Sequence, residues 1–464
     1  MSTHNLDSDI LIVIFSFLSS SDLTSVALVN KSFNAIAVPR LYHTIYFRDS
    51  GLQKWPNLPS PFETILKRPE LAIHVRCCGM SIMFLPTDEL ICLIITEISS
   101  LPRPPMGNRL ISKFMNSCIE SLSTLCSNIH TFRFIVHHPA FISILRGKKR
   151  LSKLQLSLGL DDITESDAEM LSQITGLHTL DLHQVPLGLC RRLPQWISNI
   201  SDTLTTFRIR TSQHLDEALF IEMGLSRLSL LEKLAFPMDE STLRIPHFPK
   251  HNLPNLHIVG ISSIPNWSEE STSGPRPGLL EPFFNSISDS PVSSIACGFA
   301  NYADFVPDET ISQIVRHFSL TLQRLSFTNA DISEKGLTEL AQFCKNLKQL
   351  TITPSPVGSP TARLTGSLSH SSSLKVLIIP PRRDQWSSIL RSEGYCTTLN
   401  IKELFRCAPS IQVMVVGGKI LMRDARPSLM NSYGPDNFRV LSAPINRFNL
   451  AFREKYGIET LGMD

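Results

Sequence analysis

Apolar residues recur along most of the chain in one short pattern, apolar-x-x-apolar-x-apolar. The end of the pattern alternates apolar and polar positions, which predicts a short strand with one buried side. Successive copies begin on average about 28 residues apart, which leaves room for a helix between one strand and the next. The eleven copies begin at Ile129, Leu151, Leu177, Leu204, Leu231, Leu253, Val292, Leu322, Leu347, Leu374 and Ile411.

The clearest copy spans residues 322–347 and shows what one unit contains. A strand is expected at residues 325–327, and Ser333 is a suitable N-cap for the helix that follows. The helical spacing of the next apolar residues predicts a stripe that faces the strand. This stripe consists of Leu337, Leu340, Ala341 and Cys344. One unit is therefore a strand followed by a helix.

This unit resembles the cysteine-containing leucine-rich repeat. The resemblance implies an α/β fold in which repeats stack into a curved solenoid, with parallel strands on the concave face and helices outside. Ala330 stands where such repeats usually carry an Asn or Cys that bonds the loop backbone, so we expect irregular turns. The residues that carry the resemblance are Leu322, Leu325, Phe327, Ile332, Gly336, Leu337, Leu340, Cys344 and Leu347.

Side chains between the apolar strand positions are expected to face the concave side, because side chains alternate along a strand. They are polar and somewhat basic in the middle of the array. At its C-terminal end they are apolar, and Val376 and Val413 add to them. Two explanations stay open there: a tail from residue 423 to 464 folds back, or a ligand or partner covers this end. The expected contacts of a target protein are Arg133, Gln155, Asp181, Arg208, Lys233, His257, Arg324, Ser326, Thr351, Ile378 and Val415.

The first forty residues follow a helical spacing instead. A first helix, with Asp7 or Ser8 as its N-cap, is apolar on more than one face, and further helical spacing ends at Pro39. Two or three short helices cannot enclose a core alone, so part of this apolar surface needs a partner. The apolar positions of the first helix are Ile10, Leu11, Ile14, Phe15 and Leu18.

The order of residues here resembles the F-box, a helical module that docks onto the Skp adaptor of cullin-RING ubiquitin ligases. The resemblance implies that this chain binds the same adaptor and ligase core. It runs through Leu6, Asp7, Ile10, Leu11, Ile14, Phe15, Leu18, Asp22, Leu23, Val26, Ala27, Leu28, Val29, Phe33, Ala35, Ile36, Ala37, Pro39, Arg40, Leu41, Tyr42, Ile45 and Phe47. The implied adaptor contacts are Leu6, Ile10, Leu11, Ile14, Leu23, Leu28 and Val29. The alternative is a helical cap that buries these residues against the next domain.

Composition narrows the class of partner and the compartment. The 464 residues carry a formal net charge of only +3, which does not favour nucleic acid or a membrane surface as the partner. Ten cysteines are too few for a disulfide scaffold, so we expect a reducing compartment, cytoplasmic or nuclear. The apolar segment 10–18 follows Asp7 and Asp9 with no Lys or Arg before it, unlike a signal peptide. Adjacent Cys77 and Cys78 are expected to be buried thiols, with a strained redox disulfide as the alternative.

No familiar catalytic motif is present. HExxH, GxSxG, GxGxxG and the phosphate-binding GxxxxGK[ST] are all missing from the sequence, so we expect a chain that is not an enzyme and needs no cofactor. His137 and His138 would point to opposite sides of a strand, which disfavours a shared metal. The basic cluster at 146–150 is expected to be a solvated turn, with nuclear import or phosphate contact as the alternatives.

These expectations combine into one hypothesis about organisation. Residues 1–47 form an F-box-like domain, 48–125 a linker with degenerate first repeats, 126–420 the solenoid, and 421–464 a C-terminal cap or tail. The chain is expected to be the substrate-recognition subunit of an SCF-type ubiquitin ligase, in which the F-box binds the adaptor and the repeats bind a target protein. The alternative is a scaffold protein that recruits no ligase. Pro- and Ser-rich segments at 101–108, 265–278 and 354–373 are expected to be loops.

Overall fold

The structure is a computed structural model of the whole chain. It describes residues 7–48, 61–81, 121–135, 140–145, 147–157, 163–183, 185–209, 224–237, 253–264, 280–354, 360–380, 401–416, 419–423 and 438–441. The chain divides into two compact units. Unit 1 comprises Met1–Leu204 with Ser212–His214, and unit 2 comprises Thr205–Thr211 with Leu215–Asp464.

Three short helices begin unit 1, as the helical spacing predicts: α1 (Ser8–Phe15), α2 (Ser20–Ala27) and α3 (Lys31–Leu41). Each begins at a side-chain N-cap, namely Asp7, Ser19 and Asn30. The expected end at Pro39 is wrong, because α3 continues to Leu41. Proline has a helical φ and costs one backbone hydrogen bond there, which does not stop the last turn. The core of the three helices consists of Leu11, Phe15, Leu23 and Ala37.

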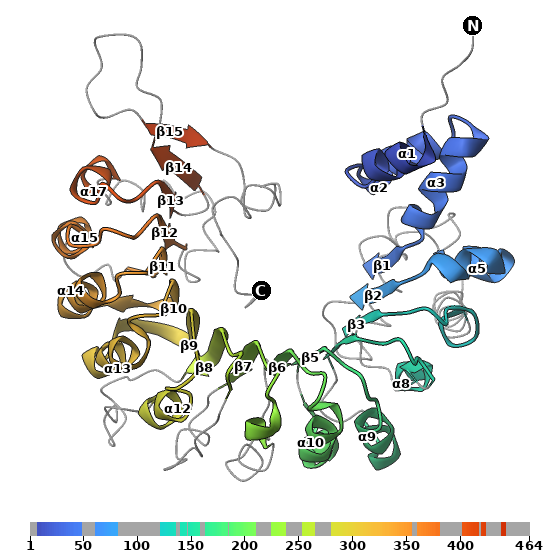
Figure 1. Cartoon of the computed structure of the whole chain (residues 1–464), viewed down its shortest axis with the longest axis horizontal. Helices are drawn as coiled ribbons and strands as arrows, with labels where there is room; N and C mark the ends of the chain where they lie inside the picture. Colours follow the sequence, from blue (N-terminus) through green and yellow to red (C-terminus); the bar gives the residue numbers. More distant parts are fainter. Residues whose placement is uncertain are drawn as a thin grey trace, which may run out of the picture. The chain divides into compact units, whose positions relative to one another are not determined.

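The rest of unit 1 alternates strands and helices. Each strand is parallel to the next one along the chain. The helices lie on one side of the strands (Figure 1). The strands are β1 (Thr44–Arg48), β2 (Cys77–Ser81), β3 (Thr131–Ile135), β4 (Lys153–Ser157) and β5 (Thr179–His183). The helices are α5 (Pro61–Lys67), η1 (Pro69–His74), η3 (Ser121–Leu125), α8 (Ala140–Leu145), α9 (Glu165–Ser172) and α10 (Leu187–Ile200).

Unit 2 continues with the same strand and helix plan. Its strands β6 to β13 are parallel in chain order, and β14 and β15 add antiparallel strands at the end. They are β6 (Thr206–Ile209), β7 (Lys233–Pro237), β8 (Ile258–Ile264), β9 (Ser294–Val306), β10 (Arg324–Ile332), β11 (Gln349–Thr351), β12 (Val376–Ile379), β13 (Val413–Val416), β14 (Lys419–Arg423) and β15 (Phe438–Leu441). The helices are η4 (Leu225–Arg227), α12 (Glu281–Ser286), α13 (Asp308–Phe318), α14 (Glu334–Phe343), α15 (Pro360–Leu368) and α17 (Ile401–Cys407). The expected α/β solenoid of parallel strands and flanking helices is confirmed.

The apolar positions of the repeated pattern form the core between strands and helices. Leu177, Leu180 and Leu182 are fully buried, and their register aligns Leu180 with Leu154 of the preceding strand. In every described pair of parallel strands, the buried apolar positions of one strand lie beside those of the next. The core is therefore continuous within each unit. We call the opposite side of the strands, which carries none of the described helices, the open face (Figure 1).

One expected repeat start is wrong. The pattern fits residues beginning at Leu253 and also residues beginning at Leu256. The structure selects the second frame, because Val259 and Ile261 are fully buried whereas Ile258 is partly exposed. The open-face position of this repeat is therefore Gly260, which pairs with Ala235, and His257 precedes the strand.

The unit at 322–347 forms the expected strand and helix, but its strand β10 continues to Ile332 and does not end at Phe327. Ser333 caps α14 by accepting a hydrogen bond from the Gly336 amide at 3.0 Å. The irregular turn expected near Ala330 is present as a register shift between β9 and β10. Asn329 adopts a left-handed φ of 61° there and donates from Nδ2 to the Phe299 carbonyl at 3.0 Å. A neighbouring Asn thus makes the bond that Ala330 cannot.

Polar side chains also join consecutive repeats. The residue just before the first apolar position of a repeat often donates to a backbone carbonyl of the repeat before it. Asn side chains reach a carbonyl two residues before the preceding repeat's first apolar position. Thr203, Thr321 and Ser373 reach the carbonyl of that position, whereas Ser410 reaches the carbonyl of Ser371, three residues before it. The donor and acceptor pairs are Asn128 with Ile73, Thr203 with Leu177, Asn255 with Ser229, Thr321 with Val292, Asn346 with Leu320 and Ser373 with Leu347.

The basic cluster is not simply a solvated turn. Gly147 has a positive φ of 83°, and the turn it makes places Lys148 inside unit 1 with 9% of its surface exposed. The Lys148 ammonium donates to the carbonyl oxygens of Leu122 at 2.6 Å, Cys126 at 2.9 Å and Ser123 at 3.3 Å. Burial lowers the pKa of Lys148. This side chain satisfies the carbonyl end of η3, where a cation is electrostatically favourable.

Replacing Lys148 tests this capping role. We expect Lys148→Ala to lower the stability of unit 1 by about 2 kcal/mol, because it leaves buried carbonyls without a donor. Hydrogen exchange at residues 121–135 should become faster, and the melting temperature should fall. The exposed neighbour substituted in Lys149→Ala is the matched control, expected to change stability by at most about 0.5 kcal/mol. Equal effects of the two substitutions would contradict a specific role for Lys148.

Candidate protein-binding surfaces

The N-terminal helices place the expected adaptor residues in two groups. Leu11 and Leu23 are buried in the core of the helices, so their side chains hold the three helices together. Ile10, Ile14, Leu28 and Val29 are exposed. Leu6 lies outside the described residues. The contact of these side chains with an adaptor stays a prediction.

Three further exposed apolar residues belong to this surface and were missed from the sequence. They are Ile12, Val13 and Phe17, of which Phe17 is 84% exposed. The signal was present, because α1 is apolar on all sides while only Leu11 and Phe15 turn inward. We call the seven exposed residues Ile10, Ile12, Val13, Ile14, Phe17, Leu28 and Val29 the helical apolar patch.

Specific polar contacts hold this patch in place. The Arg40 guanidinium of α3 donates from Nη2 to the Ile12 carbonyl of α1 at 2.6 Å. Ser19 and Asp22 form a reciprocal capping box that begins α2. Phe15 and Phe33 pack edge to face, with their ring centroids 5.5 Å apart. The exposed apolar residues therefore stand on helices that are fixed by their own core.

On the open face of unit 1, three expected residues share one row. The strand register aligns Arg133, Gln155 and Asp181 across β3, β4 and β5. Arg133 is exposed, Gln155 is half-buried and Asp181 is buried. His183 joins them, since its Nε2 lies 2.9 Å from Gln155 Nε2 and 3.5 Å from Asp181 Oδ1. Its position two residues after Asp181, on the same strand face, is the signal that could have identified it.

On the open face of unit 2, the middle of the sheet is basic with a floor of small residues. Arg208, Lys233 and Arg324 are all partly exposed. Gly260 is packed so closely that a Cβ there would lie 3.0 Å from the Ala235 Cβ. Among the described residues, no Asp or Glu occupies the two rows between β6 and β10. These rows are Arg208, Ala235, Gly260, Ala296 and Ser326, and Thr206, Lys233, Ile258, Ser294 and Arg324.

The C-terminal end of the open face is already covered. The register places Thr351, Ile378 and Val415 in one row, as expected. However, Thr351 and Val415 are buried, and only Ile378 is partly exposed. A target could touch the two buried side chains only by displacing what covers them. We therefore leave Thr351 and Val415 out of the target surface, together with the misplaced His257.

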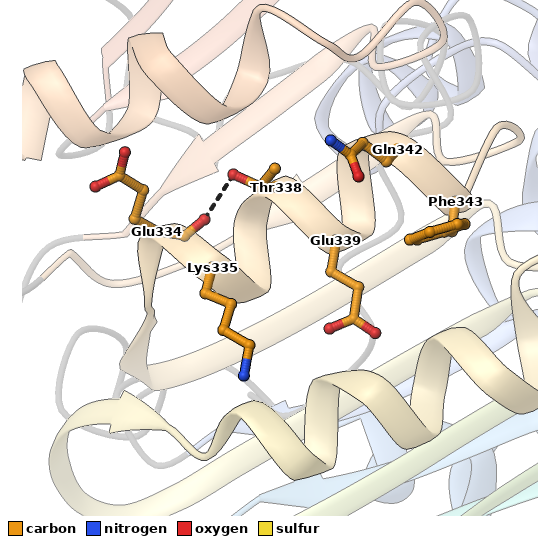
Figure 2. A pocket seen from close by; sticks show the side chains of 6 residues that line it. All are labelled: Glu334, Lys335, Thr338, Glu339, Gln342 and Phe343. Carbon is orange, nitrogen blue, oxygen red and sulfur yellow. Dashed lines mark hydrogen bonds between the residues drawn. The ribbon is translucent and has the colours of Figure 1, made fainter.

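A shallow hollow of about 620 Å³ lies on the helix side of unit 2, over α14 (Figure 2). Two of its charged side chains have partners from α13: Lys335 Nζ lies 3.5 Å from Asp308 Oδ2, and the Ser312 hydroxyl donates to Glu339 Oε2 at 2.8 Å. These contacts join two repeats and place no nucleophile beside a base. The lining residues are Glu334, Lys335, Thr338, Glu339, Gln342 and Phe343.

The described cysteines and histidines do not form a reactive centre. Burial raises the pKa of the Cys126 thiol to about 11 and those of Cys297 and Cys344 to about 12, which keeps them protonated. Cys77 and Cys78 are both free thiols. In the part of the chain that the structure describes, no group of three or more His, Cys, Asp or Glu could hold a metal ion. His137 and His138 lie outside those residues.

Comparison with known proteins matches the N-terminal helices. Residues 7–48 match the family model "F-box-like". No curated protein matches the chain. Among solved structures, the chain is similar to the "Crystal structure of TLR13-ssRNA13 complex", with 12% sequence identity and a TM-score of 0.30 over 64% of this chain and 44% of that one. No helix in the described ranges is long and apolar enough to cross a membrane.

Thiol burial predicts the order of alkylation. At pH 8, a pKa near 11 or 12 leaves about 0.1% or less of a thiol as the reactive thiolate. Among the described cysteines, we expect iodoacetamide to modify the half-buried Cys77 and Cys407 first, as measured by peptide mass spectrometry over time. Unfolding in urea is the control, since it should make these seven thiols react alike. Fast modification of any buried thiol in the folded protein would contradict the packing; the buried set is Cys78, Cys126, Cys190, Cys297 and Cys344.

Proposed function

We propose that this chain is the substrate-recognition subunit of an SCF-type cullin-RING ubiquitin ligase. The observation that carries the proposal is the helical apolar patch on a segment that matches the F-box-like model. The Skp adaptor would cover this patch and connect the chain to the cullin core. The strand and helix units would hold a target protein. The chain itself would supply proximity, by raising the concentration of the target near the transferring enzyme.

The exposure of the patch favours a partner over an internal cap. A cap that folds back would bury its apolar side chains within the chain, yet Phe17 and Leu28 are more than four-fifths exposed. Seven large apolar side chains exposed on helices of this length are typical of a surface that binds another protein. This ligase role also assigns the chain to the cytoplasm or nucleus, where ubiquitin transfer takes place.

Charge substitution in the patch tests the adaptor contact. We expect Ile14→Asp with Leu28→Asp to weaken binding of the purified Skp adaptor at least about 100-fold, because each aspartate would have to be desolvated in an apolar interface. Binding should be measured by titration calorimetry on the full chain. Leu320→Asp is the matched control, since Leu320 is 83% exposed, as Leu28 is 82% exposed, but lies in unit 2.

Two outcomes separate the ligase role from a scaffold role. Loss of adaptor binding in the double variant with an unchanged circular dichroism spectrum supports the ligase subunit. If the unsubstituted chain does not bind the adaptor, the proposal is wrong and the chain is a scaffold with an F-box-like cap. If the double variant binds as tightly as the unsubstituted chain, the patch is not the adaptor surface.

The open face of unit 2 suggests the chemistry of the target. Arg208 and Lys233 stand beside a floor of small residues, with no acidic side chain in the described rows between β6 and β10. A narrow acidic segment of a target protein would fit this surface, since its carboxylates would pair with the cations and its backbone could approach Gly260 closely. Arg133 and Gln155 offer a second polar area in unit 1.

Charge reversal tests this target surface. We expect Arg208→Glu with Lys233→Glu to remove specific proteins from the set labelled by proximity biotinylation in cells, because like charges would then repel an acidic segment. Lys345→Glu is the control, as Lys345 is an exposed lysine at the end of α14, away from the open face. Adaptor labelling should persist in all variants. Identical sets of labelled proteins would contradict the basic target surface.

A further inference from the structure

The turns that lead into β10, β11 and β12 combine exposed cations with exposed apolar side chains. They lie at the edge of the sheet where the strands begin, and they comprise residues 316–323, 343–348 and 369–375. No Asp or Glu occurs in these three segments, all of which the structure describes. Their exposed cations include Arg316, Lys348 and Lys375.

Backbone hydrogen bonds hold the three turns side by side. The Lys348 amide donates to the Gln323 carbonyl at 2.7 Å, and the Lys375 amide donates to the Lys348 carbonyl at 2.8 Å. Gln323, Lys348 and Lys375 therefore form one row, in which neighbours stand one strand spacing of about 4.8 Å apart. Gln323 also accepts a hydrogen bond at its Oε1 from the Lys348 ammonium at 3.0 Å.

The two lysines of this row are not explained by the helix ends. Lys348 and Lys375 follow the turns and directly precede the strands, whereas a cation that offsets a helix dipole lies in the last turn of the helix. Their like charges stand on adjacent strands, and no carboxylate in these turns offsets them. An anionic partner would reduce this repulsion.

The apolar side chains of the same turns are unusually exposed. Leu320 is 83% exposed and Phe343 is 57% exposed, the two largest values for a large apolar side chain in the described part of unit 2. Phe343 ends α14, and Leu320 lies two residues after the end of α13. Asn346 donates from Nδ2 to the Leu320 carbonyl at 2.7 Å, which joins the two turns. Exposed apolar groups of this kind mark a contact surface.

The neighbouring turns of unit 2 lack this combination. The turn before β9 contains the exposed Asp289, and the turn before β7 places Glu232 two residues after the exposed Leu230. The turn before β13, residues 408–412, contains no charged residue. Cations, exposed apolar side chains and the absence of acids thus coincide before β10, β11 and β12.

These observations favour a protein segment as the occupant. The backbone fixes the spacing of Lys348 and Lys375, and it is close to the roughly 5–6 Å that separates residues three or four apart on a helix. A nucleic acid would pair with the cations but leave Leu320 without an apolar contact. A lipid surface needs no fixed spacing of cations, and the net charge of +3 does not favour it.

We propose that these three turns bind an acidic segment of another protein that also carries large apolar side chains. Its carboxylates would pair with Lys348 and Lys375, and its apolar side chains would cover Leu320 and Phe343. We call these four residues the edge patch. The edge patch is separate from the open face, and the inference goes beyond the ligase role, because it depends on neither the adaptor contact nor the open-face target.

Peptide binding to the full chain tests the edge patch. The probe is a fluorescein-labelled synthetic helical peptide with Glu on one side and Leu beside it, measured by fluorescence anisotropy. We expect Leu320→Ser with Lys375→Glu to weaken its binding at least about 10-fold, because the variant removes an apolar contact and reverses a charge. Leu187→Ser with Arg191→Glu is the matched control on α10, where Leu187 is 46% exposed and Arg191 is also exposed. This control should bind like the unsubstituted chain.

Photo-crosslinking locates the bound peptide. Benzoylphenylalanine in place of Leu320 should crosslink to the peptide on irradiation, as identified by mass spectrometry. The same group in place of Leu230, an exposed leucine beside Glu232, should give several-fold less product. Equal yields at the two positions would contradict a specific site at the edge patch.

Three further outcomes would overturn the proposal. Equal affinity for a peptide with Lys in place of Glu would show an apolar contact without charge recognition. Loss of binding in Arg208→Glu with Lys233→Glu, but not in Leu320→Ser with Lys375→Glu, would place the peptide on the open face. Binding of phosphatidylserine vesicles that the edge-patch variant abolishes, with no binding of the acidic peptide, would show a lipid surface instead.

Discussion

The structure depends on the fact that no single strand and helix unit can cover its own apolar side. Each unit buries its leucines and phenylalanines only when the next unit aligns with it, and the strand register provides that alignment. Fully burying one such side chain stabilises the fold by about 1.5–3 kcal/mol, so a slip of one residue in register would lose several of these contributions at once. This constraint explains why the alternation persists through repeats whose helices vary in length.

Polar groups that this apolar packing buries are paired with specific hydrogen-bond or ion-pair partners. Where a helix end would leave carbonyls buried, Lys148 supplies an ammonium. Where β10 ends, Asp331 is fully buried and pairs with Arg363 of α15 in the next repeat. The hydrogen bonds of Asn, Ser and Thr side chains between repeats likewise supply donors to backbone carbonyls of the preceding repeat. These contacts add specificity of alignment, because a buried charge or carbonyl without its partner is costly.

The two kinds of exposed surface follow from this arrangement. In the N-terminal helices, the last six of the eight residues of α1 are apolar, while only Leu11 and Phe15 of these are buried in the core of the three helices. The remaining apolar residues of α1 are exposed and form part of the helical apolar patch. In the repeats from β6 to β10, most apolar residues of the strands lie in the core, and the open face carries Arg208, Lys233 and Arg324. One surface is therefore suited to an apolar partner, and the other to a charged one.

Much of this follows from the sequence alone, because it rests on local periodicity. The period of two along each strand predicted that Arg133, Gln155 and Asp181 share a row, and the caps at Asp7 and Ser333 marked where helices begin. Tertiary structure decided the rest. Leu253 and Leu256 begin equally good patterns, and only burial against a helix selects the second and removes His257 from the open face.

Long-range packing also determines whether a given side chain is buried or exposed, even where two residues occupy equivalent positions in the sequence pattern. Lys148 and Lys149 are neighbours of the same type, yet only one meets three carbonyls from a segment more than twenty residues away. Val415 occupies the same strand position as Gln155, yet it is covered. Periodicity specifies which side of an element a residue faces. What lies against that side depends on segments distant in sequence, whose approach no local pattern encodes.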